Sequence, residues 1–447
     1  MKNKQLLCVT LMFGVLLSLD GVAQTTNVPG ITNPNTLSME SYFSDVCTPF
    51  LNLGTNNPRV KIQAASQQAE GQLANACQDY FYGERSSDIQ QTFIEGIDPT
   101  GFIAFKLDSL LFAQTTNDSV MDRMQALRRS QNQVSNNAYN YSGNAIGGGA
   151  SADESSELLN KPLGLWFRAN GSGGTKDVTL LTGKLDDSQF AGAAGVDYRL
   201  GQNAVLGGSL GYRDSKAKFG DGGAAGNMDS KTFNIAAYFS SYLYKNLYLD
   251  TVINYGDVKY DTRRNILDLS SPPVLYTADG KTNGKTLSGG LALGYEFASG
   301  GWTITPSAHY FYTDSKTDAF EEEGSGAYDL DFGKQHYHSS SGRLDLNVSY
   351  AINSDAGVWL PHLRTEWIKE FGANIDTFDV RFVNASDTTL APLPIQQDKL
   401  DDQYFRITLG VSAQFRNDVS AYLDYQQLVG FDQVTFYNVA AGLRFQF

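Results

Sequence analysis

The strongest constraint on the fold is a long series of alternating segments in residues 162–447. Each segment places apolar side chains at every second position, and clusters of Gly, Asp and Asn separate the segments. In the last segment, apolar side chains from Tyr437 to Phe447 share one face, while Arg444 and Gln446 lie on the other. A side-chain period of two is typical of β-strands with two different faces. The sequence therefore predicts a β-sheet structure for this region.

The polar faces of these segments carry arginines, for example Arg406 and Arg444. An unpaired arginine in the packed interior of a sandwich would cost several kcal/mol. We therefore expect this face to line a wet interior, or the sheet to be a single layer. A polar interior with an apolar exterior is typical of a barrel that sits in a membrane. A soluble, secreted β-sandwich is the alternative.

The number of segments predicts a closed all-β transmembrane barrel of about 12 antiparallel strands. Bacterial outer-membrane barrels use an even number of strands, and an open edge in lipid would leave backbone groups unpaired. The candidate strands lie near residues 163–170, 188–200, 204–219, 230–243, 247–262, 284–298, 301–316, 336–352, 357–371, 403–416, 418–430 and 435–447. Tight turns are expected near 200–203, 244–246, 299–301 and 416–418, and long, outward-facing loops near 219–230, 263–284, 317–335 and 372–402.

The N-terminus predicts export from the cytoplasm. In residues 1–23, Lys2 and Lys4 precede an apolar run, and small residues follow at a cleavage site before Gln24. Cleavage removes Cys8 and leaves Cys47 and Cys77 in an oxidising compartment. We therefore expect one disulfide between them, worth about 3 to 4 kcal/mol in the chain-entropy model. Two buried free thiols are the alternative.

Residues 24–130 predict a small, mainly helical domain, and residues 131–161 predict a linker rich in Gly, Asn and Ser. The spacing of apolar residues favours helices near residues 60–77 and 120–129, and Arg128 suits the negative C-terminal end of the second helix. We expect the apolar side chains of this domain to form its core, namely Phe93, Phe102, Phe105, Leu110, Leu111 and Phe112.

The predicted barrel also carries a series of short motifs. Their main residues, in chain order, are Trp166, Gly195, Asp197, Pro361, Trp367 and Phe371. The chain then ends on a segment in which Leu443, Phe445 and Phe447 share the apolar face. Together with the signal and the exported N-terminal region, this series resembles the monomeric autotransporters of type V secretion.

The resemblance implies an outer-membrane barrel with a helix in its lumen, which brings the N-terminal region to the cell surface as a passenger. The helix would lie in residues 119–141, or in a short helix within 152–159. Leu443, Phe445 and Phe447 would form the signal read by the outer-membrane assembly machinery. Trimeric relatives contribute only four strands per chain, so twelve strands favour a monomer surrounded by outer-membrane lipid. The passenger is shorter than is usual in the family, and Asn136-Asn137 is the only suggestion of a self-cleavage site.

Charge and histidine content exclude several functions. A formal net charge of -14 is unsuited to nucleic acid, which requires a cationic surface. All four histidines lie in the predicted barrel, so residues 24–130 cannot supply a Ser-His-Asp or Cys-His arrangement. His336 and His338 share a strand face but lack a third metal ligand nearby. We predict no catalytic site, no metal site and no cofactor.

Two functions remain for the chain. The first is an autotransporter whose barrel translocates or anchors the helical passenger at the cell surface, where it acts as a binding or adhesion module for an unknown ligand. The second is an outer-membrane pore or structural barrel whose N-terminal domain stays in the periplasm.

Overall fold

The computed structural model describes residues 32–51, 65–83, 85–140, 162–179, 181–201, 203–220, 225–371, 377–384, 390–396, 401–415 and 419–447. The predicted signal at 1–23 and most of the predicted linker lie outside the described residues. So do the second candidate for the lumen helix, 152–159, and the predicted turn at 416–418.

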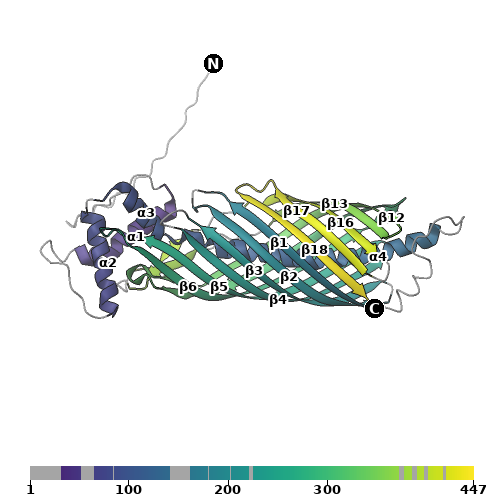
Figure 1. The fold of residues 1–447 in the computed structure, drawn as a ribbon, viewed down its shortest axis with the longest axis horizontal. Coiled ribbons are helices and arrows are strands. Elements are labelled where there is room, and N and C mark those ends of the chain that lie inside the picture. Colours follow the sequence, from purple (N-terminus) through teal and green to yellow (C-terminus); the bar gives the residue numbers. More distant parts are fainter. Residues whose placement is uncertain are drawn as a thin grey trace, which may run out of the picture.

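Twelve long strands close into an antiparallel barrel in the described part of the chain, as predicted (Figure 1). They are β1 (Leu163–Lys176), β2 (Leu185–Leu200), β3 (Ala204–Phe219), β4 (Gly226–Tyr244), β5 (Leu247–Leu267), β6 (Leu275–Tyr295), β8 (Trp302–Thr317), β11 (Gln335–Tyr350), β13 (Gly357–Glu370), β16 (Gln403–Phe415), β17 (Val419–Val429) and β18 (Val434–Gln446). The barrel closes where β1 pairs with β18, with Gly164 opposite Gln446 and Lys176 opposite Val434. This closure leaves no open barrel edge between the first and last strands.

The two faces of the barrel wall differ as the alternation predicts. Leu291 and Leu409 point outward and are 52% and 57% exposed, whereas Arg406 points inward and is 5% exposed. The inner face is not uniformly polar, however. Trp166, Tyr238 and other buried side chains form an apolar cluster inside the barrel. The outer surface is therefore suited to lipid, and the inner face is covered by protein rather than by open water.

The two ends of the barrel carry different connections. At one end, here called the turn end, strands join through short turns at residues 245–246, 300–301 and 355–356. Gly300 and Gly301 adopt φ angles of 56° and 91°, a left-handed region that favours glycine. Two short strands flank these turns, β7 (Phe297–Ser299) and β12 (Ile352–Ser354). The chain terminus at Phe447 lies at the same end (Figure 1).

The opposite end, here called the loop end, contains more regular structure than the sequence predicted. The predicted loop at 263–284 is mostly hairpin, because β5 continues to Leu267 and β6 begins at Leu275. The predicted loops at 317–335 and 372–402 contain β9 (Phe320–Glu323), a 3-10 turn η3 (Gly326–Tyr328), β10 (Leu330–Phe332), β14 (Phe378–Phe382) and β15 (Leu393–Ile395). These segments are too short for a clear period, and their buried aromatic side chains stabilise them through contacts with distant helices.

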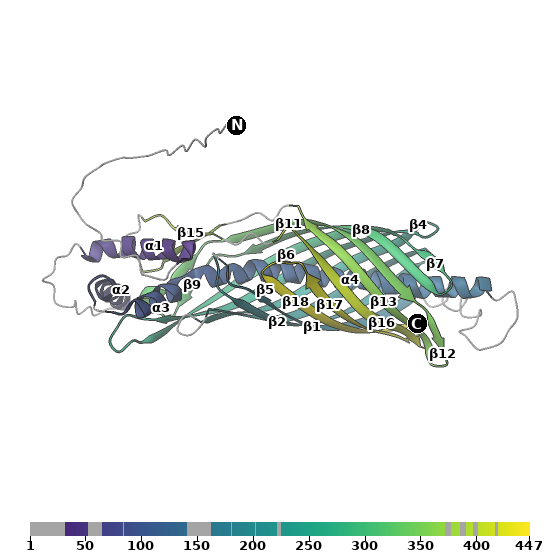
Figure 2. The ribbon, with the colours of Figure 1, turned by 90° about the horizontal axis from the view of Figure 1, so that it is seen from above.

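Helices precede the barrel, and the first three of them sit at its loop end (Figures 1 and 2). They are α1 (Pro34–Leu51), α2 (Ala65–Tyr82) and α3 (Ser87–Ile97), followed by a 3-10 turn, η1 (Pro99–Ile103). A disulfide between Cys47 and Cys77 joins α1 to α2, which confirms the predicted pairing. Among the described residues, no helix is long and apolar enough to cross a membrane.

Helices α1–α3 and η1, here called the cap, share one hydrophobic core with the loop end of the barrel. The ring of Phe93 lies 5.5 Å from that of Tyr328, and Phe102 lies 4.7 Å from Phe332. Asn35 adds two backbone contacts: its Nδ2 donates to the carbonyl of Gln396 at 2.7 Å, and its Oδ1 accepts from the amide of Gln396 at 3.0 Å. The cap therefore does not project as a separate domain but is packed on the barrel.

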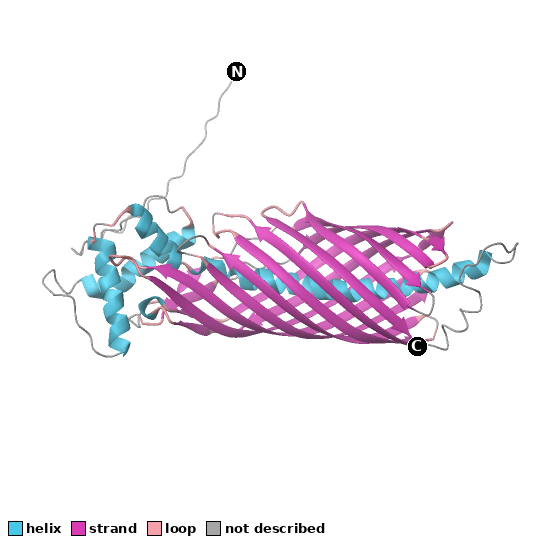
Figure 3. Cartoon of the chain, viewed as in Figure 1, coloured by secondary structure: helices cyan, strands magenta, loops and turns pink. Residues whose placement is uncertain are grey.

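A fourth helix, α4 (Ala104–Asn140), runs through the lumen from the loop end and emerges beyond the turn end (Figures 2 and 3). The helix predicted at 120–129 is thus only its central part. Helix α4 also continues past residue 130, where the sequence suggested that the domain gives way to the linker. The first part of the helix gave no clear signal because residues 104–114 are buried on every side, so no single apolar stripe marks them in the sequence.

Candidate functional site: the ion-paired lumen

Helix α4 is joined to the barrel wall by charged side chains along its length. Asp108, Asp118, Arg123 and Arg128 are each at most 6% exposed and each has an oppositely charged partner on the wall. Burying such charges is costly unless each one is paired and hydrogen-bonded. The partners thus determine where along the axis the helix can sit.

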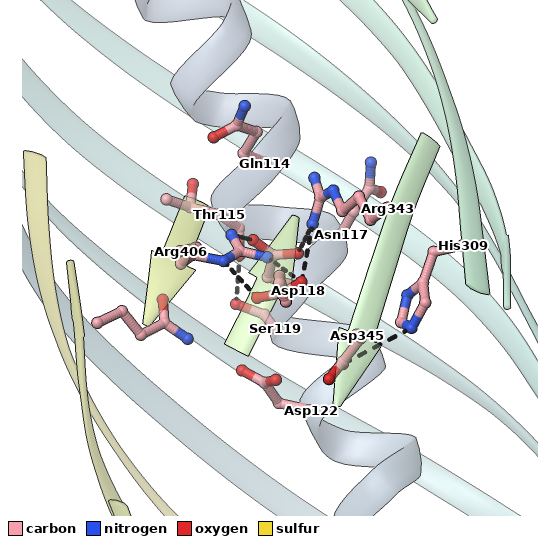
Figure 4. Close-up of polar contacts among 12 residues, drawn as sticks. Gln114, Thr115, Asn117, Asp118, Ser119, Asp122, His309, Arg343, Asp345 and Arg406 are labelled. Carbon is pink, nitrogen blue, oxygen red and sulfur yellow. Dashed lines mark hydrogen bonds and ion pairs between the residues drawn. The ribbon is translucent and has the colours of Figure 1, made fainter. Parts of the chain in front are cut away.

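Asp118 lies at the centre of the largest group of ion pairs (Figure 4). Its Oδ1 accepts a hydrogen bond from Arg343 Nη1 on β11 at 2.6 Å, and its Oδ2 accepts from Arg406 on β16. Arg406 in turn donates to Glu366 on β13, with Nε at 2.6 Å and Nη2 at 2.7 Å from the carboxylate oxygens. The guanidinium of Arg343 also stacks over the ring of Phe311, 4.1 Å from its centroid.

Asp122 continues this group one helical turn further on. Its Oδ1 accepts from Arg364 Nη1 at 2.7 Å, and its Oδ2 accepts from Arg168 Nη1 on β1 at 2.9 Å. Arg364 Nε also donates to Asp345 Oδ2 at 2.5 Å. We call the group the Asp118 cluster; its members are Arg168, Arg343, Arg364, Arg406, Asp118, Asp122, Asp345 and Glu366. Four guanidinium groups thus face four carboxylates, and the formal charges balance.

Ion pairs near the two ends of the lumen hold the rest of the helix. Towards the loop end, Asp108 Oδ1 accepts from Arg213 Nη2 at 2.6 Å and from Ser230 Oγ at 3.0 Å. Towards the turn end, Arg128 donates to Asp250, and its guanidinium lies 3.6 Å from the centroid of the Tyr248 ring. Arg128 was expected to interact with the end of its own helix, so the structure corrects that expectation. Its side chain instead binds the barrel wall.

The barrel is matched by known proteins. A family model described as the autotransporter β-domain matches residues 165–426, more than half of the chain. The chain belongs to the autotransporter β-domain family. The family and its outer-membrane relatives place it in the outer membrane.

Two solved structures and one curated relative illustrate the likeness of this autotransporter to others. The translocator domain of the autotransporter NalP from Neisseria meningitidis has a TM-score of 0.51 and 17% identity, covering 76% of this chain and 99% of that one. The β domain of the Bordetella autotransporter Brka has a TM-score of 0.46 and 21% identity, covering 64% and 100%. Outer membrane protein B of Rickettsia typhi is 23% identical over 355 residues, or 78% of this chain. The autotransporter spans about a fifth (20%) of the length of that relative.

Three of the motif residues come together next to α4. Trp166 on β1 packs its ring over Gly195 on β2, where an added Cβ would lie 2.4 Å from the ring. Trp166 Nε1 also donates to the hydroxyl of Tyr238 at 2.8 Å. Asp197 accepts a hydrogen bond from Arg123 Nε at 3.2 Å. In this autotransporter the motif therefore makes room for one large ring and positions one acceptor for the helix.

The other motif residues lie elsewhere on the barrel. Pro361 and Trp367 point outward from β13, and the ring of Phe371 lies over Gly342 on β11. The side chains of Leu443 and Phe447 also face outward, while Phe445 is half-buried. Their roles in assembly remain predictions.

Of the four barrel histidines, His336 and His338 lie near each other. His336 Nε2 lies 2.6 Å from Asp314 Oδ2, and its ring is 5.8 Å from that of His338. Among the described residues, no group of three or more His, Cys, Asp or Glu side chains is arranged to hold a metal. The chemistry that the lumen does display is strong, charge-assisted binding of a helix.

The ion-pair partners on α4 were not recognised from the sequence. A signal for them does exist, because Asp118 and Asp122 are four residues apart and so share one helical face. The inward-facing arginines of several strands require carboxylates to pair with, and these aspartates are suited to that role. The pairing could not be assigned without knowing the axial position of the helix.

Proposed function

We propose that the barrel of this autotransporter anchors the cap at the cell surface as an exported passenger, and that the cap acts there as a binding or adhesion module. The observation that carries the proposal is the position of α1–α3, which pack against the loop end. Outer-membrane barrels have short periplasmic turns and longer extracellular loops. The loop end is therefore the end that we assign to the exterior.

The path of the chain supports this orientation. The cap lies at the loop end, α4 runs through the lumen, and β1 begins at the turn end (Figure 2). A single passage through the barrel thus separates the N-terminal region from the first strand. The ion pairs of Asp108, Asp118, Asp122, Arg123 and Arg128 favour retention of the helix after export. Retention would keep the cap attached to the cell.

We propose that the protein is a monomer. We also propose that the terminal residues Leu443, Phe445 and Phe447 are recognised by the outer-membrane assembly machinery. Support comes from the outward direction of Leu443 and Phe447, which leaves their side chains accessible on the last strand. Removal of Phe447 should lower the amount of folded barrel in the membrane fraction. The Phe447→Tyr variant keeps an aromatic end and should restore it.

The orientation can be tested with two epitope tags in the full chain. One tag is inserted after Gly83, between α2 and α3, and the other after Asp355, in a turn at the turn end. On intact cells, an antibody should label the first tag only, and it should label both after the outer membrane is permeabilised. Labelling of the second tag alone would instead support a pore or structural barrel with a periplasmic N-terminal domain.

The binding role requires a separate measurement. Cells that display the whole chain are compared with cells that display a variant lacking residues 32–97, for adherence to host cells and to each other. Equal amounts of folded barrel in the two strains are the control. Stronger adherence with the cap supports a binding module, whereas equal adherence would leave the anchoring role and remove the adhesive one.

A further inference from the structure

Near the last strand, the described part of the lumen contains a group of charges with more arginines than carboxylates. Arg444 on β18 points inward and is 5% exposed, and its Nε has no hydrogen-bond partner. In the part of the chain that the structure describes, no carboxylate forms an ion pair with it. The charged groups whose fields act on it are Arg123, Asp197 and Arg199.

Asp197 is the single carboxylate of this group, and it is already bound to Arg123. Arg199 follows two residues after Asp197 on β2, and its Nε also lacks a partner. Among the described residues, three guanidinium groups therefore share one carboxylate, which leaves a formal excess of two positive charges there. The Asp118 cluster, in contrast, has equal numbers of both signs. Since arginine stays protonated in proteins, it cannot relieve this excess by losing a proton.

A cavity lies beside Arg444, between α4 and the wall formed by β16, β17, β18 and β1. Its volume is about 50 Å³, and its lining is mixed: apolar side chains such as Trp166 and Leu360 surround it together with the polar side chains of Arg123, Arg444, Gln414, Ser420 and Tyr422. This space is larger than a single water requires. Of its polar residues, Arg123 already donates to Asp197, whereas Arg444 keeps an Nε–H without a partner. Gln414, Ser420 and Tyr422 carry further hydrogen-bond donors.

We propose that this cavity is a binding site for a small inorganic anion of the size of chloride. The anion would accept hydrogen bonds from Arg444 and supply the missing counter-charge between α4 and the last strand. It would thereby stabilise the helix against the wall at the place where the strands that close the barrel meet. Neither the fold nor the proposed export function requires such a site, so the inference stands apart from both.

The test measures the thermal stability of the full, refolded chain in nonionic detergent. Sodium chloride is titrated against sodium gluconate at constant ionic strength, so that general screening is unchanged. For the natural sequence, the melting temperature should rise with chloride and then level off, as it does when a ligand binds only the folded state. Arg444→Met, which keeps an unbranched side chain, should show no such rise. Arg263→Met changes an exposed arginine and should retain the full response.

A second variant keeps the test valid if Arg444→Met does not fold. Ser420 lies directly opposite Arg444 in the pairing of β17 with β18. Ser420→Asp would place a carboxylate beside Arg444, so it should raise the melting temperature in gluconate and abolish the response to chloride. Ser420→Asn has the same size without the charge and should keep the response.

Crystals of the natural sequence soaked in bromide give an independent readout, because bromide scatters anomalously. A peak within hydrogen-bond distance of Arg444 would support the site. No peak, or a chloride response that is equal in the natural sequence and in the Ser420→Asp variant, would overturn the proposal.

Discussion

Asp118 illustrates how a charge can be buried in a membrane protein. Arg343 and Arg406, from different strands, each donate to one of its two carboxylate oxygens. Arg406 also donates to Glu366. Each guanidinium donates several hydrogen bonds in a planar arrangement, which suits such shared pairs better than an ammonium group would. The residue therefore connects the helix to two strands of the wall, β11 and β16, which flank β13.

Replacing Asp118 with Asn should lower the stability of the barrel by about 3 to 5 kcal/mol, because Arg343 and Arg406 would lose a buried partner. Urea unfolding of the refolded chain, followed by the loss of heat-modifiable mobility on gels, measures this change. Asp355→Asn, in an exposed turn, is the control and should have no effect. Equal midpoints for the two variants would show that the ion pairs contribute little.

Asp98 lies at the junction of α3 and η1, and its carboxyl group should make the stability of the cap depend on pH. Burial raises the pKa of its carboxyl to about 6, although it accepts hydrogen bonds from Thr36 Oγ1 and from the Thr100 amide. The unfolded chain has a pKa near 3.9 for this group. Between these two values the folded form holds a proton that the unfolded form has lost. Stability therefore falls as the pH rises from about 4 to about 6, and it changes little above that.

The Asp98→Asn variant should remove this dependence. At pH 7 its cap should be more stable by up to about 3 kcal/mol, since the buried charge is absent, and at pH 4 it should match the natural sequence. Hydrogen exchange of α1–α3 across this pH range is the measurement. If, in the natural sequence, the amides of the cap are equally protected from exchange at pH 4 and at pH 7, the prediction is contradicted.

At the scale of elements, the strands were predictable and the lumen helix was not. Strand β18 was recognised because Tyr437, Val439 and Leu443 must face lipid while Arg444 must not, so its period of two is strict. Helix α4 has Phe112 near the loop end and Asp118 in the middle, each matched to a different part of the wall. Its surroundings change along its length, so a single amphipathic period cannot describe it.

The contact between β1 and β2 can be tested with a double-mutant cycle. Gly195→Ala should destabilise the barrel by about 1 to 3 kcal/mol, because the new methyl group would overlap the ring of Trp166. In a Trp166→Ala background the same change should cost little, since the ring is gone. Gly171→Ala, where an added Cβ meets no neighbour, is the control. Equal costs in both backgrounds, by thermal melting, would show that the ring does not select glycine.

The disulfide should stabilise the cap but not the barrel. Replacing both Cys47 and Cys77 with Ser opens a loop closed over a separation of 30 residues, which should cost about 3 to 4 kcal/mol in the chain-entropy model. Limited proteolysis should then cleave α1 and α2 faster, while the barrel keeps its heat-modifiable mobility. A reduced sample of the natural sequence should behave in the same way. Unchanged cleavage of the cap would indicate that packing on the loop end alone holds the helices.

At the scale of the whole molecule, the barrel should have a low ionic conductance. Side chains of α4 fill the lumen, so the full chain in a planar bilayer should conduct little current. A variant lacking residues 32–140 should conduct, and anions should be favoured. Of the Asp118 cluster, the arginines Arg168, Arg343, Arg364 and Arg406 would then remain with two carboxylates, Asp345 and Glu366. Large currents from the full chain, or a preference for cations in the variant, would contradict this reasoning.

The bond between Cys47 and Cys77 also bears on the order in which the protein is made. If the cap is exported through the lumen, the segment between Cys47 and Cys77 would pass as two side-by-side stretches of chain when the disulfide is formed. The same segment would pass as one extended chain when the cysteines are reduced. Oxidation and passage are therefore competing events. A strongly oxidising periplasm would then stop the cap part-way through the barrel, and slower oxidation would let more molecules complete export. The amount of cap at the cell surface would therefore report how fast the two cysteines are oxidised in the periplasm.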